Sequence, residues 1–513
     1  MIAKFRSIWL GLAAVLCLLL VVGCGNTFRQ FITPVPGPSG DPGDLSHAVV
    51  TSTNPAASGL GSNLHVNVSG DSLSGVVPLG PTPFFFGYGQ GRAFTLDANG
   101  NLLTYTGLAP LTTALQTAAP PAGANGQVAA GMTSGGAIYV VNSATDNVSP
   151  LSATSSAFSS PLALPATSHK PVMVAAGLAD KIYVVNNTSN DVTVISTLDN
   201  NILKTVPVGP SPIWAVMSSD GVNVFVVNQG DGTVSVLDTT LDIEVCSDTH
   251  NVVPCTPANR IHVGTSAGSS PNFAFFDGPR RRVYVTNTGE NTVSVIKADG
   301  VNLGVNPPIV PTLLANVTVS GRPTSVTALA DGTRAYAALG GCPAGVNHLT
   351  IIASLPLCTG NLVSVIDAVG LLQSSTILVG PGAVSIASAS DSSRVYVISA
   401  FDTTTIKDNN HNPNCVIGQP CTSTGGPCIA LPCLAGPPLP NRTFPTTPSV
   451  SVIKTSTNTV IRYGTDPSLP GLIPTFLTPA QNPTCVATID PNFNKTFGMP
   501  CAGQIPFHVL VIP

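Results

Sequence analysis

The cysteines are the residues of this sequence whose number and spacing most clearly indicate a chemical role. Ten of the 12 cysteines lie in the second half of the chain or just before it, as close sequence neighbours. None of these pairs has the C-x-x-C spacing or the nearby histidine of a zinc site, and C-x-x-C-H for haem attachment is absent. An even number of cysteines suits an oxidising compartment. The spacing therefore favours five local disulfides, which join Cys246 with Cys255, Cys342 with Cys358, Cys415 with Cys421, Cys428 with Cys433, and Cys485 with Cys501.

One run of side-chain oxygens could bind a cation. It alternates ligands in the manner of a calcium loop, at Asp408, Asn410, Asn412 and Asn414. Pro413 replaces the glycine that such a loop requires, and Gln419 stands where a bidentate glutamate belongs. The run is a calcium candidate that departs from the motif, and we expect no other metal and no organic cofactor.

Patterns that would support catalysis are sparse. The eight histidines are scattered singly, with no H-x-H or H-E-x-x-H pair. Residues 264–268 match G-x-S-x-G, but they lie between two expected strands and no helix follows them, so we interpret them as a turn. Residues 70–73 resemble the opening block of the GDSL hydrolases, a family that also needs a later Asp-x-x-His, which this chain lacks. These patterns favour a non-catalytic protein and leave catalysis as an open alternative.

The first residues form an export signal. Lys4 and Arg6 precede an apolar run over residues 8–22 that is short for a membrane span. The run ends in Val21-Val22-Gly23-Cys24, which resembles a bacterial lipobox. The resemblance implies removal of residues 1–23 and acylation of Cys24, including a palmitate or similar chain, so that the mature protein is held by lipid in the cell envelope, with the outer membrane or its periplasmic face favoured. The alternative is an ordinary secretory signal that happens to contain a cysteine.

Composition limits the remaining classes. Only 9% of residues are charged and the net charge is −4, so the composition does not indicate the basic surface that nucleic-acid binding needs. The one basic run, residues 280–282, is expected to be a solvated turn. With 49 glycines and 47 prolines, the chain is rich in turns and favours many short strands. Residues 24–46 include a Pro- and Gly-rich stretch typical of a linker.

A repeat runs from residue 47 to residue 513. Each copy is a strand with a central aromatic or apolar residue, a polar turn and a second strand, as in Tyr183 to Ile195 and in Tyr284 to Ile296. The central positions recur at intervals of 42 to 60 residues, at Val49, Phe94, Tyr139, Tyr183, Phe225, Tyr284, Tyr336 and Tyr396. A period in the low forties is typical of a four-stranded propeller blade. Asparagines at the strand ends, such as Asn186 and Asn287, are expected to close turns, where a left-handed backbone is common.

The copy at Tyr284-Val285-Thr286-Asn287, followed by 291–296 (NTVSVI), resembles the YVTN β-propeller repeat family. The resemblance implies an all-β propeller. Eight copies of this first strand predict eight blades, with seven as the alternative if the copy at Val49 is an extension. The last strand, residues 507–512, is of the type that precedes an aromatic strand, so we expect the N- and C-terminal strands to pair and close the ring.

Four insertions interrupt the repeat, at residues 242–258, 340–360, 402–448 and 464–505, and they contain the ten paired cysteines. The last three follow strands that end on the same face, which predicts one disulfide-linked cap over a sector of one rim; the first is expected on the opposite face. We therefore expect a non-catalytic envelope lipoprotein that binds a protein, a glycan or another envelope partner. The alternatives are a hydrolase or lactonase-like enzyme with a site in the central channel and, with less support, an electron-transfer propeller.

Overall fold

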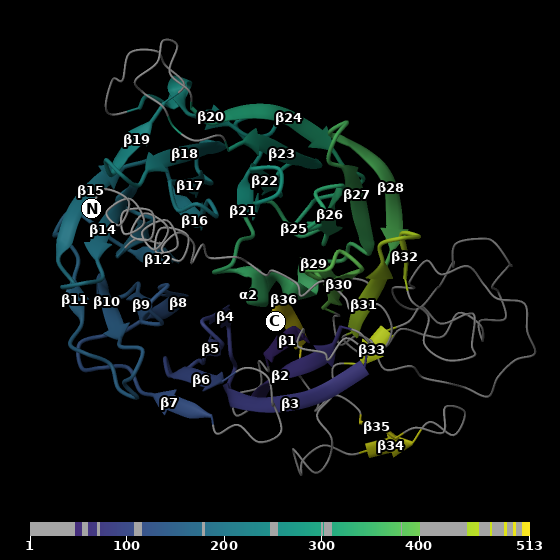
Figure 1. Cartoon of the computed structure of the whole chain (residues 1–513), viewed down its shortest axis with the longest axis horizontal. Helices are drawn as coiled ribbons and strands as arrows, with labels where there is room; N and C mark the ends of the chain where they lie inside the picture. Colours follow the sequence, from purple (N-terminus) through teal and green to yellow (C-terminus); the bar gives the residue numbers. More distant parts are fainter. Residues whose placement is uncertain are drawn as a thin grey trace, which may run out of the picture.

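The computed structural model forms a ring of small antiparallel sheets around a central axis (Figure 1). It describes residues 47–53, 60–68, 72–106, 115–176, 180–246, 255–298, 301, 310–380, 382–400, 449–460, 472–474, 487–489, 496–498 and 505–512. Within those ranges, no helix has both the length and the apolar character that a membrane span needs. The prediction of an all-β propeller is confirmed.

The sheets make eight blades, which excludes the seven-blade alternative. From the axis outward, blade 1 consists of β36 (Ile505–Ile512), β1 (His47–Thr53), β2 (Leu60–Asn67) and β3 (Ser72–Pro81), and blade 2 of β4 (Phe85–Gly89), β5 (Arg92–Leu96), β6 (Leu102–Thr106) and β7 (Gln116–Ala118). Blade 3 consists of β8 (Gln127–Met132), β9 (Ile138–Asn142), β10 (Asn147–Leu151) and β11 (Leu162–Ala163). Blade 4 consists of β12 (Pro171–Ala176), β13 (Lys181–Asn186), β14 (Asp191–Ser196) and β15 (Ile202–Pro207).

Blades 5 to 8 continue the same order. Blade 5 consists of β16 (Pro212–Met217), β17 (Asn223–Asn228), β18 (Thr233–Asp238) and β19 (Ile243–Val245) with β20 (Ile261–His262), and blade 6 of β21 (Pro271–Asp277), β22 (Arg282–Asn287), β23 (Thr292–Lys297) and β24 (Thr312–Thr318). Blade 7 consists of β25 (Ser325–Ala328), β26 (Arg334–Leu339), β27 (Leu362–Asp367) and β28 (Leu372–Leu378). Blade 8 consists of β29 (Ala383–Ser388), β30 (Arg394–Ser399), β31 (Ser449–Lys454) and β32 (Thr459–Val460) with β33 (Leu472–Pro474). Short helices are η1 (Pro257–Asn259), α2 (Ile351–Ser354) and η2 (Leu355–Leu357), and β34 (Ala487–Ile489) pairs only with β35 (Thr496–Gly498).

The two ends of the described chain close the ring, as the sequence predicts. β36 pairs antiparallel with β1, with His47 opposite Ile512 and Val50 opposite Val509. Blade 1 therefore takes its innermost strand from the C-terminal end of the chain and its other three strands from the N-terminal end. This pairing gives β1 a neighbour on its inner side and removes an exposed sheet edge.

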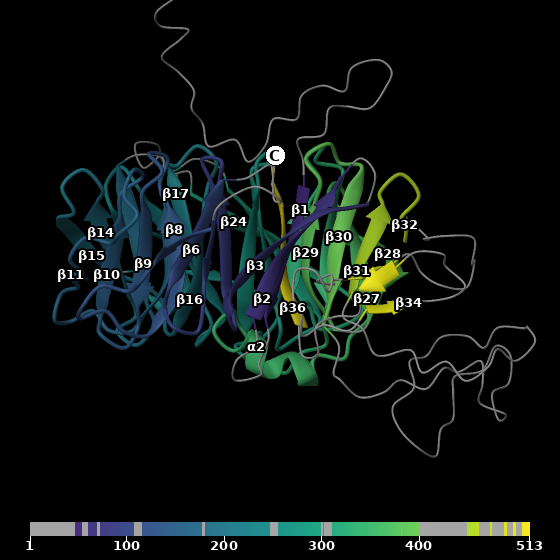
Figure 2. The same ribbon diagram turned by 90° about the horizontal axis from the view of Figure 1, so that it is seen from below.

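Strand direction gives the disc two different faces. β1 begins and β36 ends on one face, which we call the terminal face. The turns after the aromatic strands, such as the segment between β26 and β27, lie on the other face, which we call the loop face. Figure 2 shows the disc from its edge, with the C-terminus on one side and α2 on the other.

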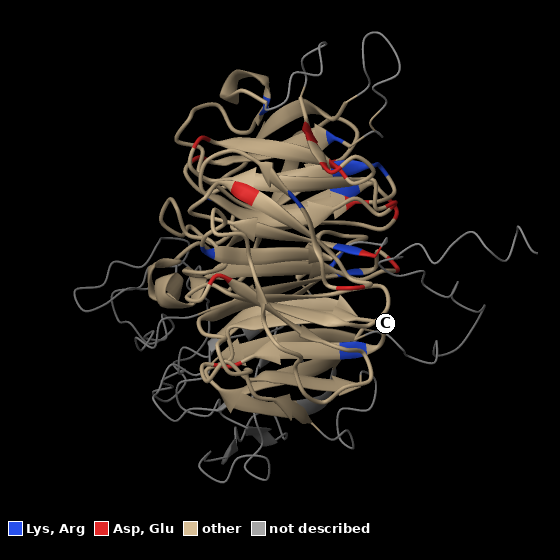
Figure 3. Ribbon diagram, turned by 90° about the vertical axis from the view of Figure 1, so that its left-hand side faces the viewer, with Lys and Arg blue, Asp and Glu red and all other residues tan. Residues whose placement is uncertain are grey.

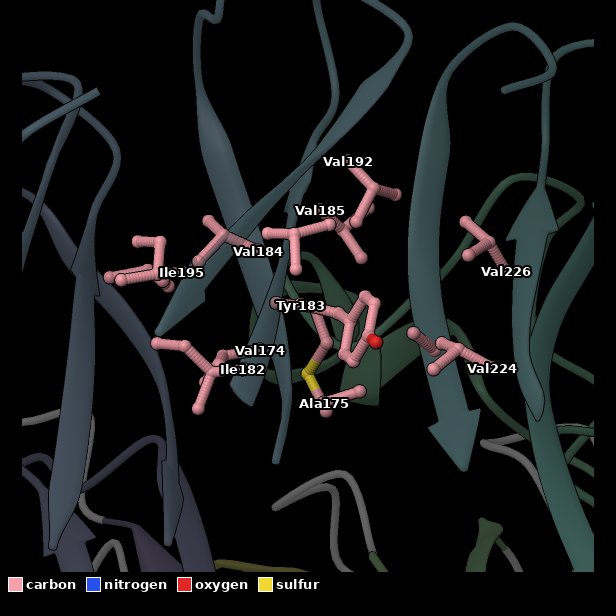
Figure 4. Close-up of a cluster of buried hydrophobic side chains, with 14 of the residues drawn as sticks. Val174, Ala175, Ile182, Tyr183, Val184, Val185, Val192, Ile195, Val224 and Val226 are labelled. Carbon is pink, nitrogen blue, oxygen red and sulfur yellow. The ribbon is translucent and has the colours of Figure 1, made fainter. Parts of the chain in front are cut away.

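The core consists of side chains packed between neighbouring blades. The repeated aromatic residues are almost fully buried, at Tyr139, Tyr183, Phe225, Tyr284, Tyr336 and Tyr396. In Figure 4 the ring of Tyr183 in blade 4 points toward Val224 and Val226 of blade 5. Their burial explains why branched and aromatic residues recur with the blade period.

The asparagines that end the aromatic strands act across the hairpin. Their side-chain amides donate to oxygens five and seven residues later, as from Asn186 to Asp191 Oδ1 (2.7 Å) and to Thr193 Oγ1 (2.9 Å). Asn142, Asn228 and Asn287 make the same pair of bonds. The expectation of a left-handed backbone at these residues is wrong, because in the first two turns the left-handed residues are Asp146 and Asn190, four positions on. The asparagines hold two strands together by side-chain hydrogen bonds.

A second recurring contact joins neighbouring blades on the terminal face. A tyrosine hydroxyl donates to an Asn or Asp in the outer turn of the next blade, from Tyr139 to Asn200 (2.8 Å), from Tyr183 to Asp242 (2.9 Å), and from Tyr336 to Asn458 (2.7 Å). Each acceptor has a positive φ, of 58°, 52° and 53° respectively, a backbone that Asn and Asp tolerate better than most residues. We call this the Tyr–turn contact.

One expectation about a surface segment is wrong. Arg280 and Arg282 donate to backbone carbonyls of Gly332 and Ala368 in blade 7, and Arg281 pairs with Asp220 of blade 5 (2.7 Å), so the basic run joins blades and is not a solvated turn. The strands that flank the predicted 242–258 insertion, β19 and β20, both pair with β18, so the insertion interrupts the outer strand of blade 5. The predicted 464–505 insertion likewise contains β33, an outer strand paired with β31.

Candidate functional site

The segment from Cys342 to Cys358 is the longest connection of the loop face among the described residues. It connects β26 to β27 and carries α2 and η2. The two cysteines are joined by a disulfide, with their Cα atoms 4.1 Å apart, and both are buried. Val346 and Leu355 are buried with them, in a cluster that includes Ile398 of blade 8. The segment is therefore a folded unit with its own small core, which we call the stapled segment.

The stapled segment starts in blade 7 and reaches across the axis to the other side of the ring. Asn347 Nδ2 donates to Gln229 Oε1 of blade 5 (2.9 Å). His348 Nε2 lies 3.0 Å from the carbonyl oxygen of Val172 in blade 4. The His348 ring also meets the edge of Trp214 of blade 5, with centroids 5.2 Å apart. Figure 1 accordingly shows α2 near the centre of the ring.

The environment of His348 fixes its charge. Burial lowers the pKa of His348 to about 4, while its bond to the Val172 carbonyl acts in the opposite direction. The ring is therefore neutral at physiological pH, and Nε2 carries the proton that it donates to Val172. A neutral donor next to the apolar ring of Trp214 holds the segment without burying a charge.

This arrangement corrects the predicted position of the cap. The sequence places a cap over a sector of one rim, but the stapled segment lies over the axis, because its hydrogen-bond partners are on the far side of the ring. Two of its leucines face solvent, Leu349 at 37% and Leu357 at 61% exposure. The other parts of the predicted cap, 402–448 and most of 464–505, lie outside the described residues. The sequence pattern could not show which blades a loop of this length would meet.

A depression of about 470 Å³ lies on the same face, between blades 3 and 4. Its charged lining consists of Asp146, His169 and Lys170. Asp146 Oδ2 accepts from His169 Nδ1 (2.9 Å), and Asp146 Oδ1 accepts from the backbone N–H of Lys170 (2.6 Å). Such a carboxylate orients the imidazole, which is half exposed, and leaves Nε2 directed away from the pair.

The depression contains one backbone feature that recurs in other blades and one side-chain pair that the recurring feature does not explain. Before several inner strands one residue has a positive φ, and in blades 2, 3, 5 and 6 that residue is Thr82, Gly126, Ser211 and Ser270. In blade 4 the residue is Lys170, with φ 58°. Ser211 N–H also donates to Asn190 Oδ1, which shows that the bond from Lys170 N–H to Asp146 belongs to the blade architecture. The pairing of His169 with Asp146 is the part that this general pattern does not explain.

Three of the scattered histidines lie on one face of blade 1. His47, His65 and His508 occupy β1, β2 and β36 on the side that packs against blade 2. His65 Nε2 lies 3.0 Å from Tyr105 Oη, which also accepts from Asn63 Nδ2 (2.9 Å). Burial, with the nearby His47 second, lowers the pKa of His65 to about 3, and burial lowers that of His508 to about 4. His65, Asn63 and Tyr105 are all buried, so this cluster is part of the seam between two blades.

The other predicted residues divide into those that the structure places and those that it does not. Cys246 and Cys255 are joined by a disulfide, with Cα atoms 5.7 Å apart. The G-x-S-x-G match is a turn as expected, since the backbone N–H of Ser269 donates to the carbonyl of Ser266 (3.1 Å). Outside the described residues lie the predicted lipidation site Cys24, the calcium candidates Asp408, Asn410, Asn412 and Asn414, and the cysteines Cys415, Cys421, Cys428, Cys433, Cys485 and Cys501. In the part of the chain that the structure does describe, no three His, Cys, Asp or Glu side chains form a group that could hold a metal.

Known proteins share the fold of this chain at low sequence identity. No family model and no curated protein sequence matches it. Among solved structures, dihydro-heme d1 dehydrogenase NirN matches with a TM-score of 0.54 and 12% identity over 84% of this chain and 75% of that protein. The periplasmic gluconolactonase of Pseudomonas aeruginosa (TM-score 0.44, 13% identity, 66% of this chain and 97% of that protein) and virginiamycin B lyase of Staphylococcus aureus (0.43, 12%, 68% and 95%) are also similar. At these identities the likeness shows the propeller fold alone.

Proposed function

We propose that this chain is an exported lipoprotein of the bacterial cell envelope whose propeller binds a protein or glycan partner through its loop face. Cys24 carries the lipid in this proposal, and residues 24–46 connect it to β1. The envelope location rests on the signal sequence and the lipobox resemblance. The binding role rests on the structure of the loop face.

One observation carries the binding role: the stapled segment lies over the axis, held on both sides of the ring. On one side it is held by the buried disulfide and by its packing on blade 8, and on the other by Asn347 and His348. The exposed Leu349 and Leu357 thus sit on a backbone that is fixed before any partner arrives. Binding residues on a rigid loop lose little conformational entropy on association, which favours recognition.

The enzymatic alternative also has a specific observation behind it. The NirN, gluconolactonase and lyase structures show that the fold hosts enzymes. In this chain the group best arranged for general base catalysis is the Asp146–His169 pair, which lies in the depression between blades 3 and 4. A hydrolase would therefore have its site at this seam and not in the central channel that the sequence suggested.

The test of the binding role is site-specific crosslinking on intact cells. A photo-crosslinking residue at Leu357 should give discrete adducts with a small number of partners. The same residue at Leu314, exposed on outer strand β24 to 40%, is the matched control and should not give them. Identical adducts from both positions, or none from Leu357 and Leu349, would contradict a partner site on the loop face. Replacing His169 with Gln should leave the adducts unchanged, since this residue belongs to the enzymatic alternative.

A further inference from the structure

We infer that the terminal face lies against the lipid bilayer and that three apolar turn residues on it, Leu198, Leu241 and Val369, contact the lipid. The inference builds on the lipid anchor of the proposed function and goes beyond it by naming a second membrane contact, made by the propeller itself. It also assigns the two faces different partners: the bilayer for the terminal face and an envelope partner for the loop face.

The direction of β1 gives the first argument. β1 begins at His47 on the terminal face, so the chain that precedes it, which includes Cys24, joins the propeller on that face. Only about 22 residues separate Cys24 from His47, and even at full extension these span at most about 80 Å. A tether on this face allows the disc to lie with the terminal face toward the membrane. The loop face then points away from the bilayer, as the opposite positions of the C-terminus and α2 in Figure 2 indicate.

The exposed apolar residues give the second argument. Leu198, Leu241 and Val369 are 77%, 54% and 69% exposed. They lie in the turns from β14 to β15, from β18 to β19 and from β27 to β28, all of which connect a third strand to an outer strand and so lie on the terminal face. Turns of this kind normally carry polar residues, and the same turn of blade 8 has Ser456 where blades 4 and 7 have Leu198 and Val369. Apolar side chains at the tips of turns suit insertion into the boundary between headgroups and acyl chains.

The positions of these residues around the ring give the third argument. They belong to blades 4, 5 and 7, whereas the tether belongs to blade 1. Three contacts and a tether spread around a disc would hold it flat on a surface, while apolar residues clustered on one blade would tilt it.

The charges on this face indicate that the contact is apolar and not electrostatic. Figure 3 shows that many of the charged residues lie toward the side of the C-terminus. Near the turn tips they neutralise one another, as Lys181 pairs with Asp242 (2.7 Å) and Arg281 with Asp220 (2.7 Å). Cations already paired with carboxylates attract anionic headgroups weakly, so vesicle binding should depend little on salt.

The first experiment uses the full lipidated chain in vesicles of phosphatidylethanolamine and phosphatidylglycerol. Hydrogen exchange in residues 197–201, 239–242 and 368–371 should be several-fold slower than in the Cys24→Ser chain free in solution, whereas exchange in 342–358 should be unchanged. Mass spectrometry of the same sample reports acylation of Cys24. An acylated chain with no protection of the three turns would overturn the inference and leave the anchor intact. A chain without acyl groups would remove the proposed anchor.

The second experiment tests the residues without the anchor. In the full-length Cys24→Ser chain, the triple variant Leu198→Ser, Leu241→Ser and Val369→Ser should bind the same vesicles about tenfold more weakly, at low and at high salt. The matched control replaces three exposed leucines of outer strands, Leu203, Leu314 and Leu378, with serine and should bind like the parent chain. All six positions are exposed, so both variants should keep the parent melting temperature. Equal loss in the two triple variants, or loss in neither, would overturn the inference.

Discussion

The seam between blades 1 and 2 and the seam between blades 4 and 5 both bury side chains between neighbouring sheets, but the buried residues differ in kind. At the seam of blades 4 and 5, a buried tyrosine ring packs on valines and its hydroxyl reaches an acceptor in the next blade, in the Tyr–turn contact of Tyr183 with Asp242. At the seam of blades 1 and 2, the buried residues include His65, Asn63 and Tyr105, which bond to one another. Blade 1 is also the blade that joins the two ends of the chain.

The comparison shows that the aromatic residue of the repeat is kept in the blades whose four strands follow one another in sequence and is lost in the blade that joins the two ends of the chain. Blade 1 takes β36 from the other end of the chain, and the aromatic position of its repeat is Val49. A smaller side chain there leaves room that His65 and Tyr105 fill. Polar groups at this seam bond only in a specific geometry, which makes the closing blade sensitive to changes in protonation.

The largest expected effect is loss of stability in acid, beginning at the seam of blades 1 and 2. The pKa of His65 is about 3 in the folded chain and about 6.5 when unfolded, so the unfolded chain binds the extra proton between these values. The free energy of unfolding should be constant above about pH 6.5 and fall below it, by up to about 5 kcal/mol from this residue once the pH reaches about 3. His348 and His508, with pKa values of about 4, act in the same direction.

Denaturant unfolding measured from pH 7.5 to 4 checks this prediction. His65→Leu should flatten the pH dependence, whereas His262→Gln, at an exposed position on β20, should not. Burial raises the pKa of Asp277 to about 6, so the folded chain binds a proton here before the unfolded chain does. Protonation of Asp277 therefore stabilises the fold between pH 6 and 4 and offsets part of the stability lost through the histidines. A free energy of unfolding that rises on acidification over this range would contradict the assignment.

The next largest effect is expected from removing the acceptor of a Tyr–turn contact. Asp242→Ala removes the carboxylate that accepts from the hydroxyl of Tyr183 and from the ammonium of Lys181, which keep only the carbonyl of Thr239, and it should lower the free energy of unfolding by about 2 kcal/mol. Leu371→Ala is the control, since Leu371 also has a positive φ (53°) in the equivalent turn of blade 7 but accepts no side-chain bond. Equal losses in the two variants would show that backbone strain and not the hydrogen bond determines the effect.

A smaller effect should distinguish two tyrosines that look identical in sequence. Tyr183→Phe removes a satisfied hydroxyl and should cost about 1.5 kcal/mol. Tyr284→Phe should cost less, because the buried Tyr284 hydroxyl has no partner in good hydrogen-bond geometry among the described residues, although the guanidinium of Arg282 lies close enough to lower its pKa. Burial of that hydroxyl raises the pKa of Tyr284 to about 12. Chemical denaturation of the two variants side by side measures the difference.

The smallest expected effect is a gain. Leu371→Asn would put the side chain found at Asn200 and Asn458 into the turn that faces Tyr284, with a backbone that asparagine tolerates better than leucine. The variant should be more stable by about 0.5–1 kcal/mol, and the gain should vanish when it is combined with Tyr284→Phe. A gain of the same size in both backgrounds would mean that backbone strain alone is relieved.

The blade architecture was accessible from the sequence because it depends on local patterns. Tyr183, Tyr284 and the other aromatic residues mark one strand per blade, and strand direction sets the face of each loop. The contacts of the candidate site were not accessible from the sequence. His348 meets Val172, which lies 176 residues away, and no sequence rule states where a loop will land across a ring. The Tyr–turn contact did leave a signal, an Asn or Asp at a fixed place in the outer turn, which could have been found by aligning Asn200, Asp242 and Asn458.

The pairing of β36 with β1 sets the order in which the molecule can be completed. Because the innermost strand of the first blade is synthesised after every strand of blades 2 to 8, those blades can form in sequence, but the circle stays open until residues 505–512 emerge. A ribosome that still holds residues 505–512 therefore keeps the propeller in an incomplete form. Loss of this strand, through a premature stop codon or proteolysis, would remove the partner of β1 and leave an aggregation-prone edge.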